Sequence, residues 1–138
     1  MVYGIGCDLC SIARMEKSLL GPHGPVFARR VFGQAEQAAL GLPLAEEEGT
    51  AHRTAHTVAS AAADFAAKEA FLKAAGTGLR EPFSLCEIEA VRLPGGAPAY
   101  HFSGRSAQWV EARRLRAHLS LSHEGGMAMA YCILETET

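Results

Sequence analysis

The sequence lacks a long apolar run and has little excess charge of either sign. Its 138 residues carry 13 Lys and Arg against 15 Asp and Glu, for a net charge of −2. No stretch has the length of a transmembrane helix, and the start, MVYGIGCDL, lacks the basic residues and long apolar core of a secretory signal. The charge balance excludes a strongly basic nucleic-acid binder but not a local basic patch. We therefore expect a cytoplasmic protein that binds neither membrane nor nucleic acid.

The chain has four cysteines and no pattern among them that predicts a metal or disulfide framework. Cys7 and Cys10 have the Cys-x-x-Cys spacing that zinc and redox sites use, but no second such pair accompanies them. The other two are Cys86 and Cys132. All four lie in or beside segments with strand character, where a thiol behaves as a small buried hydrophobe. A zinc or redox site is therefore the weakest of the functional hypotheses.

The length and composition suit one globular domain. A chain of 138 residues can bury a substantial core and is short for two domains. Its hydrophobic fraction of 49% is typical of a soluble protein. We expect residues 1–138 to form a single domain.

The segment 65–79, FAAKEAFLKAAGTGL, combines a helix with a glycine-rich loop. The helix should end at Gly76, which can adopt the positive φ of a helix C-terminus. Glu69 lies three and four residues from large apolar side chains, so its carboxylate shares their helix face and needs a cation. That cation is either Lys73, as an i,i+4 pair at the edge of the core, or a bound metal. The loop that follows offers backbone N–H groups and a hydroxyl suited to phosphate.

Residues 2–9, VYGIGCDL, alternate in the manner of a β-strand. The larger side chains share one face, while Gly4, Gly6 and Asp8 share the other. Glycines beside the acid leave room for close approach by another element or by a ligand. Asp8 itself is interpreted either as a cap of the next helix or as a functional carboxylate.

The remaining pattern alternates helices with hairpins. Ser11 is the expected N-cap of a helix over residues 12–20. In order, the sequence then predicts a helical region over 26–40 interrupted at Gly33, a long helix over 53–75, a strand over 85–93 paired with 99–103, a helix over 106–116, and a hairpin of residues 118–123 and 127–134. His123 lies at a strand end, where a histidine is more often structural than chemical. This order predicts an α+β fold with an antiparallel β-sheet packed on a long central helix.

Taken together, these segments resemble the holo-acyl-carrier-protein synthase type of 4′-phosphopantetheinyl transferase. The resemblance covers nearly the whole chain and is most specific in two signatures, G-I-G-x-D near the start and F-x-x-K-E-A-x-x-K-A-x-G-T-G in the middle. It implies transfer of the phosphopantetheine arm of coenzyme A to a serine of an acyl carrier protein, with release of adenosine 3′,5′-bisphosphate. It also implies a homotrimer with active sites between subunits. Which subunit supplies each residue, and whether the carrier serves fatty-acid, polyketide or other synthesis, stay open.

The resemblance also assigns roles to residues. Asp8 and Glu69 become the Mg²⁺ ligands and, with Lys73, the catalytic residues; coenzyme A binding is assigned to Lys73, Gly76, Thr77, Gly78 and His123. Mg²⁺ prefers oxygen ligands and is commonly held by one or two carboxylates together with substrate phosphates. The proton of the attacking serine would pass to Glu69 or to a water near Asp8. The physical chemistry of these residue types agrees with the implied reaction.

Partner binding is expected on the first helix. The family's carrier proteins are acidic, so a basic surface should attract them. Arg14 matches an arginine of the family pattern, and Met15 with Leu19 would add apolar contact. Arg29 and Arg30 make the next helical region basic as well.

One departure from the family pattern concerns charge. Asp64 precedes Phe65 where relatives commonly have arginine, and Glu46 to Glu48 replace a basic cluster in the preceding linker. His52, Arg53 or Arg80 would have to compensate for the missing cation. The alternative hypothesis is therefore a protein that has lost catalysis and binds only a carrier protein or another subunit, and Asp64 is its only support.

Overall fold

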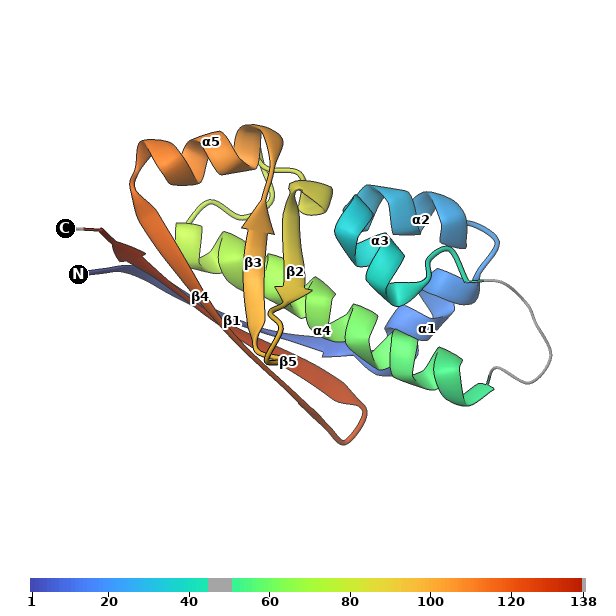
Figure 1. The fold of residues 1–138 in the computed structure, drawn as a ribbon. Coiled ribbons are helices and arrows are strands. Elements are labelled where there is room, and N and C mark those ends of the chain that lie inside the picture. Colours follow the sequence, from blue (N-terminus) through green and yellow to red (C-terminus); the bar gives the residue numbers. More distant parts are fainter. Residues whose placement is uncertain (45–50, 138) are drawn as a thin grey trace.

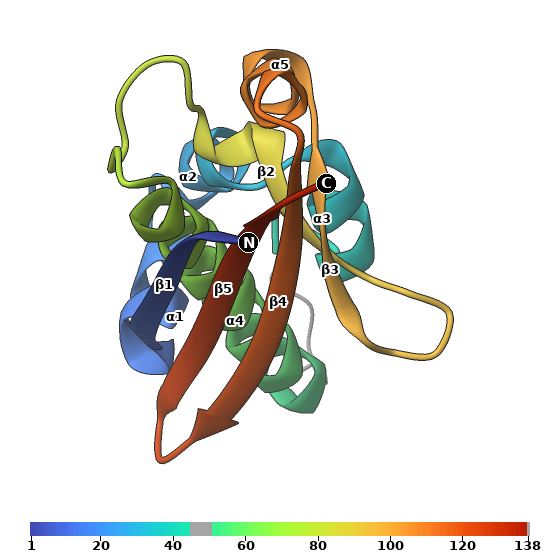
Figure 2. The same cartoon turned by 90° about the vertical axis from the view of Figure 1, so that its left-hand side faces the viewer.

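The fold is arranged around one long helix, α4 (Ala51–Ala75). The computed structural model describes residues 1–44 and 51–137, and the side chains of all of these except residues 51–53. With 25 residues, α4 is about 37 Å long at 1.5 Å per residue. Figures 1 and 2 show it lying between a three-stranded sheet on one side and a two-stranded sheet on the other. The expected long helix over 53–75 is confirmed.

The three-stranded sheet consists of β1 (Val2–Ser11), β5 (Met127–Thr136) and β4 (Leu115–Glu124), with β5 in the centre and all pairs antiparallel. Its helix-facing side is built from small residues. A Cβ added at Gly4 or Gly6 would overlap the carbonyl oxygens of Ala74 and Ala70 on α4. The close approach predicted for this strand is confirmed, and the approaching group is the helix.

Three short helices follow β1 and pack near the first half of α4 (Figure 1). They are α1 (Ile12–Leu20), α2 (Gly24–Val31) and α3 (Gln34–Leu40). The Oγ of Ser11 accepts a hydrogen bond from the N–H of Arg14 at 3.3 Å, which confirms the predicted N-cap. The interruption expected at Gly33 is also confirmed, since this residue separates α2 from α3.

The second sheet pairs β2 (Ile88–Arg92) with β3 (Pro98–Phe102), and α5 (Gly104–Ala112) follows. Two expected boundaries are wrong here. Leu85–Glu87 forms a 3₁₀ turn, η1, instead of the start of a strand, and Glu87 accepts hydrogen bonds from the N–H and hydroxyl of Ser106. The helix expected over 106–116 ends at Ala112, because Arg114 has a φ of +50° that turns the chain into β4.

The fold class is α+β with antiparallel sheets, as the sequence predicts, although the strands divide between two sheets. The two sheets and α5 enclose an aromatic cluster around Phe71, which contacts Phe83, Tyr100, Phe102 and Trp109. Among the residues described, no helix has the length and hydropathy needed to span a membrane.

Candidate functional site

Asp8 and Lys73 meet where β1 crosses the last turn of α4. The Lys73 Nζ donates hydrogen bonds to Asp8 Oδ1 at 3.0 Å and to the carbonyl oxygen of Cys7 at 2.9 Å. The Asp8 side chain is 18% exposed and that of Lys73 is 56% exposed, so the pair opens to solvent. The hydrogen bond to Asp8, together with its charge, raises the pKa of Lys73. Asp8 is therefore no helix cap, since Ser11 caps α1.

Glu69 lies one turn before Lys73 on the same side of α4 and is half-buried. Partial burial and the nearby Asp8 charge raise the pKa of Glu69, whereas Lys73 acts in the opposite sense. Lys73 pairs with Asp8 and not with Glu69, so the structural i,i+4 interpretation of this segment is wrong. The carboxylates of Asp8 and Glu69 are therefore close enough to repel each other, and the charge of Lys73 acts on both.

The donor set at this position suits a hard divalent cation. Two carboxylates are the usual protein contribution to a Mg²⁺ site, in which waters and substrate phosphates complete the shell. Within the described parts of the chain, no three His, Cys, Asp or Glu residues are grouped to hold a metal. Cys7 is exposed on the outer face of β1 and Cys10 is buried against the helix side, so these two thiols do not converge on one zinc ion.

The Gly-Thr-Gly loop ends α4 with a φ of +80° at Gly76 and +65° at Gly78. The N–H groups of Gly76, Thr77 and Gly78 all point back to the carbonyl oxygen of Leu72, at 3.1 to 3.4 Å. The Thr77 hydroxyl donates to Gly78 O at 2.9 Å. The expectation of free donors is therefore wrong for this conformation, and the loop's contact with coenzyme A stays a prediction. The hydrogen bonds of the Thr77 and Gly78 N–H groups, at 3.4 Å, are long, so these two groups are weakly held.

His123 lies elsewhere on the sheet. It is the last residue but one of β4, the edge strand opposite to β1, with β5 between them. Two strand spacings alone separate it from Asp8 by about 10 Å. His123 instead lines a cleft of about 490 Å³ together with His56, Ser60 and Arg92. One chain thus brings Asp8, Glu69 and Lys73 together but does not add His123 to them.

The two residues expected to bind a partner differ in exposure. Arg14 is exposed on α1, while Met15 is 3% exposed and belongs to the core. Leu19 is buried as well, so it does not offer the surface contact expected of it. Arg14 and Met15 do line one cavity of about 250 Å³ with Phe27 and Phe65. A partner would reach Met15 only through this cavity.

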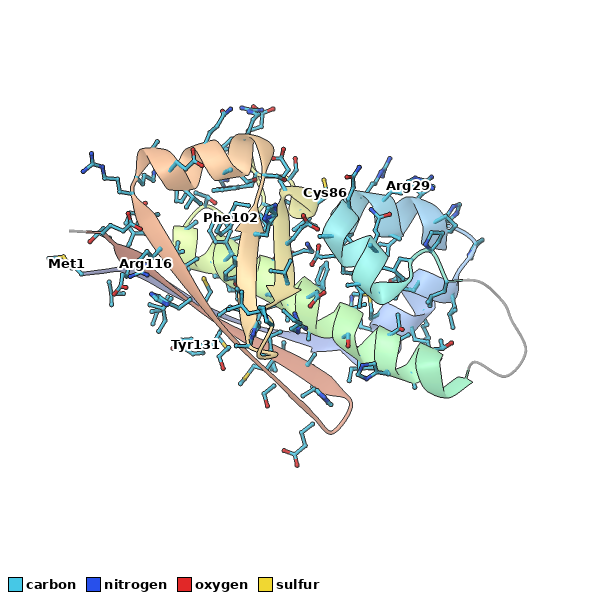
Figure 3. The ribbon with its side chains drawn as sticks, in the orientation of Figure 1. Met1, Arg29, Cys86, Phe102, Arg116 and Tyr131 are labelled. Atoms are coloured by element: carbon cyan, nitrogen blue, oxygen red, sulfur yellow. The ribbon has the colours of Figure 1, made fainter. Side chains whose placement is uncertain are left out.

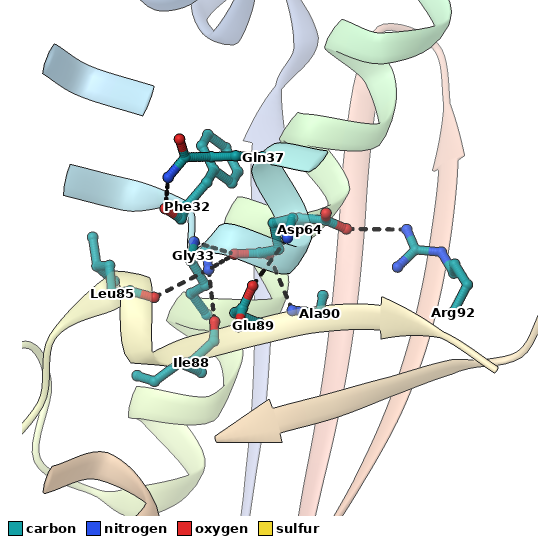
Figure 4. Close-up of polar contacts among 11 residues, drawn as sticks. Phe32, Gly33, Gln37, Asp64, Leu85, Ile88, Glu89, Ala90 and Arg92 are labelled. Carbon is teal, nitrogen blue, oxygen red and sulfur yellow. Dashed lines mark hydrogen bonds and ion pairs between the residues drawn. The ribbon is translucent and has the colours of Figure 1, made fainter. Parts of the chain in front are cut away.

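The sequence reasoning missed a buried polar network on the other side of α4 (Figure 4). Lys68 Nζ is fully buried and donates to Glu36 Oε1, to Ile88 O at 2.6 Å and to Leu85 O at 3.1 Å. Glu36 also accepts the N–H of Gly33 and of Ala90, at 3.1 and 3.0 Å. Every described buried side-chain polar atom has a partner. The sequence signal that could have revealed this network is the position of Lys68 among the alanine and phenylalanine residues of 65–71, which predicts a buried side chain.

Asp64 belongs to this buried region, next to the network. Its side chain is 5% exposed, and its Oδ1 accepts a hydrogen bond from Arg92 Nη2 at 3.0 Å (Figure 4). Burial raises the pKa of Asp64 to about 6, against the lowering effect of Arg92. Asp64, the acid that departs from the family pattern, is thus paired with Arg92 of β2. Of the residues expected to supply the missing cation, Arg80 is exposed, and the side chains of His52 and Arg53 lie outside the described residues. The acidic run of Glu46 to Glu48 also lies outside them.

Comparisons with known proteins agree with the geometry. The family described as the 4′-phosphopantetheinyl transferase superfamily matches residues 4–132. A holo-[acyl-carrier-protein] synthase of Delftia acidovorans is 37% identical over 137 residues, covering 98% of both chains. The corresponding protein of Leptothrix cholodnii is 38% identical, covering 99% of this chain and 98% of its own.

Solved structures show the same likeness. The holo-[acyl-carrier-protein] synthase of Neisseria meningitidis has a TM-score of 0.74 and 29% identity, covering 99% of this chain and 100% of its own. The synthase of Bacillus anthracis in complex with CoA (3′,5′-ADP) has a TM-score of 0.73 and 31% identity, covering 99% of each. The resemblance inferred from the motifs is confirmed. The chain belongs to the 4′-phosphopantetheinyl transferase superfamily and, within it, to the holo-[acyl-carrier-protein] synthase enzymes.

Proposed function

We propose that residues 1–138 form one catalytic domain that transfers 4′-phosphopantetheine from coenzyme A to a serine of apo acyl carrier protein, with Mg²⁺ as cofactor. The observation that carries this proposal is the convergence of Asp8, Glu69 and Lys73 at the crossing of β1 and α4. The names of the relatives and the coenzyme A complex of one of them support it.

In the proposed reaction the serine oxygen attacks the phosphorus that bears the pantetheine arm. The bond from this phosphorus to the oxygen of the adenosine-side phosphate breaks, and adenosine 3′,5′-bisphosphate leaves with that oxygen. The serine proton passes to Glu69 or to a water beside Asp8. Asp8 and Glu69 would hold the Mg²⁺, which when bound neutralises negative charge on the phosphates.

Lys73 contributes to this chemistry through its ammonium group. Within the described residues two of its three N–H groups are engaged, by Asp8 and by the Cys7 carbonyl. The Lys73 side chain is more than half exposed, so its third N–H is accessible to a phosphoryl oxygen. A fixed cation at this point stabilises the charge that develops on the phosphoryl group and the leaving nucleotide.

We further propose that the active unit is a homotrimer with sites between subunits. The outer face of β1 and β5 carries exposed apolar side chains: Ile5, Leu9, Met129, Tyr131 and Ile133. Ile5 pairs with Ile133 and Leu9 with Met129, so the stripe is continuous across two strands, and Tyr131 lies on it (Figure 3). Such a stripe is best buried against other copies of the chain. Burial of this face against other copies would bring the β4 edge of one copy beside the β1 edge of the next, and His123 of one copy would then lie near Asp8 of the next.

Mixing inactive variants tests this arrangement. Asp8→Asn mixed with Glu69→Gln should give no rescue, because one chain brings both carboxylates together. Asp8→Asn mixed with His123→Ala should restore part of the activity, because assembled trimers would contain some sites free of both changes. Absence of rescue in the second mixture, with mixed trimers verified by mass spectrometry, would contradict the proposed position of His123.

The carrier protein should dock beside Arg14, whose guanidinium is exposed on α1. Arg29, labelled in Figure 3, extends from α2 on the same group of helices. Two basic helices near each other are the electrostatic complement of an acidic carrier protein. No observation favours the alternative of a non-catalytic binding module, since its one support, Asp64, is matched by Arg92.

The decisive experiment is mass spectrometry of an apo acyl carrier protein incubated with this protein, coenzyme A and Mg²⁺, beside a sample with EDTA. We expect the carrier to gain one phosphopantetheine group only when the metal is present. No gain with several carriers and a folded protein would overturn the proposed transfer. An equal gain in EDTA would overturn the proposed metal dependence alone.

A further inference from the structure

Asp8 already binds a cation that belongs to the chain itself. The Lys73 Nζ donates to Asp8 Oδ1 at 3.0 Å and to the carbonyl oxygen of Cys7 at 2.9 Å. Carboxylate and carbonyl oxygens are also the ligands that a hard divalent cation prefers. Among the described residues Glu69, the second carboxylate of the site, forms no ion pair. The Lys73 ammonium therefore contacts one of the two carboxylates proposed to hold Mg²⁺ and not the other.

The Lys73 ammonium and a divalent cation cannot both bind Asp8 without a cost. Two cations on one carboxylate repel each other, and each uses negative charge that would attract the other. Mg²⁺ also loses its waters reluctantly, so one or two carboxylates hold it weakly until substrate phosphates complete its shell. An ammonium group can compete with a cation that is held so weakly. The pair of Asp8 and Lys73 should therefore oppose metal binding when coenzyme A is absent.

Lys73 is the member of this pair that can change its partner. Its side chain is 56% exposed near the end of α4 and has a flexible four-carbon stem. Asp8 is held more firmly, because the glycines of β1 lie directly against the backbone of α4. The other acceptor of Lys73, the Cys7 carbonyl, belongs to the backbone of β1. This second hydrogen bond can keep the ammonium at the site while Asp8 is exchanged for another acceptor.

We propose that the Lys73 ammonium competes with Mg²⁺ for Asp8, and that coenzyme A ends this competition by offering Lys73 a phosphoryl oxygen in place of Asp8 while the bond to the Cys7 carbonyl remains. The inference rests on the proposed function and adds a regulation of the same site. Metal and coenzyme A then bind cooperatively, because a phosphate that takes Lys73 leaves Asp8 for the metal.

The first test is calorimetry with MgCl2 alone, without coenzyme A or carrier protein. Lys73→Met should bind Mg²⁺ about fivefold more tightly than the wild type, because the metal then displaces no ion pair and meets no like charge. A fivefold change corresponds to about 1 kcal/mol. Lys17→Met, which removes an exposed lysine of α1, should bind Mg²⁺ like the wild type. A lysine that only supported the shape of the site would give weaker metal binding when removed.

The second test observes the lysine itself by NMR. The chain has only three lysines, Lys17, Lys68 and Lys73, so each ammonium group can be assigned and followed. At saturating MgCl2 the ammonium protons of Lys73 should exchange with water faster, because their bond to Asp8 is lost. The buried Lys68 and the exposed Lys17 are internal references whose exchange should not change. If Lys73 were only a nearby charge, its bond to Asp8 would persist and its exchange rate would stay the same.

The outcomes separate the inference from the proposed function. Equal or weaker Mg²⁺ binding by Lys73→Met would overturn the competition, and so would an unchanged exchange rate of Lys73 at saturating MgCl2. Either result leaves the transferase proposal intact. Failure of the wild type to bind Mg²⁺ even in the presence of coenzyme A would instead overturn the proposed metal site itself.

Discussion

Two lysines on α4, Lys68 and Lys73, form ion pairs in opposite environments. The Lys68 side chain is 0% exposed and its three N–H groups meet three acceptors inside the protein. The Lys73 side chain is 56% exposed, and that of its carboxylate partner Asp8 is 18% exposed. The first pair is enclosed in a completed network, whereas the second leaves donor capacity for a ligand.

The comparison shows that ion pairing alone does not distinguish a structural site from a functional one. Burial lowers the pKa of Lys68 and raises that of Glu36 to about 7, because both charges are removed from water. The hydrogen bond to Asp8 raises the pKa of the exposed Lys73. Burial thus opposes the charged forms of Lys68 and Glu36, and the hydrogen bonds of the buried network offset this. The pair of Lys73 and Asp8, beside solvent, has no such opposition, and the hydrogen bond favours the charged lysine.

The largest expected effect comes from breaking the buried pair. Lys68→Met should lower the free energy of unfolding by about 3–5 kcal/mol, because it leaves Glu36 buried without its cation. Urea denaturation followed by circular dichroism measures this loss. The double variant Lys68→Met with Glu36→Gln should recover part of the stability, since the unpaired charge is gone. A single variant as stable as the wild type would show that the network does not hold the fold.

At the exposed site the largest effect should be on activity. Glu69→Gln keeps the size of the side chain but removes one carboxylate charge, so kcat should fall about 10² to 10³-fold, as is typical when a charge-stabilising group is lost. The thermal midpoint should remain near that of the wild type, because Glu69 is only half-buried. Glu111→Gln, on the surface of α5, controls for loss of a carboxylate elsewhere. Unchanged turnover in Glu69→Gln would rule out its proposed role as a metal ligand.

The same contrast explains what the sequence could predict. The cap at Ser11, the glycines that admit α4 and the acids of the exposed site have local signals, because each depends on neighbours in the sequence or on a short repeat. The bonds of Lys68 to Glu36 and of Arg92 to Asp64 join segments 32 and 28 residues apart. Nothing local marks Arg92 on a strand end as the partner of Asp64, so the charge change looked uncompensated from the sequence.

Position within an assembly is also invisible to local patterns. The family resemblance groups His123 with Lys73 and the Gly-Thr-Gly loop, yet the strand order places it at the opposite edge of the sheet from Asp8. The predicted end of α5 is wrong for a related reason. Residues 113–116 are arginine and leucine, which are good helix formers. The pairing of β4 with β5, which begins at Leu115, overrides this local propensity.

A smaller effect is expected for Asp64, because burial raises its pKa in the folded protein to about 6, above the ordinary value of 3.8. Between these values the folded state retains the proton more readily than the unfolded state, so stability associated with this group falls as pH rises through about 6. Asp64→Asn should flatten that part of the pH profile and stabilise the protein at pH 7. Thermal unfolding from pH 4 to pH 8 measures it, and an unchanged slope would contradict the raised pKa.

The smallest effect on stability is expected at Lys73. Lys73→Met should change the free energy of unfolding by less than about 1 kcal/mol, because an exposed pair gains little over its hydrated charges. Its transfer activity should nonetheless fall about tenfold or more, because the variant lacks the ammonium group proposed to contact the phosphoryl group. Lys17→Met, on exposed α1, is the matched control for loss of a surface lysine. If Lys73→Met destabilised the protein as much as Lys68→Met, the exposed pair would be structural after all, since only a pair that contributes to folding would show so large a loss.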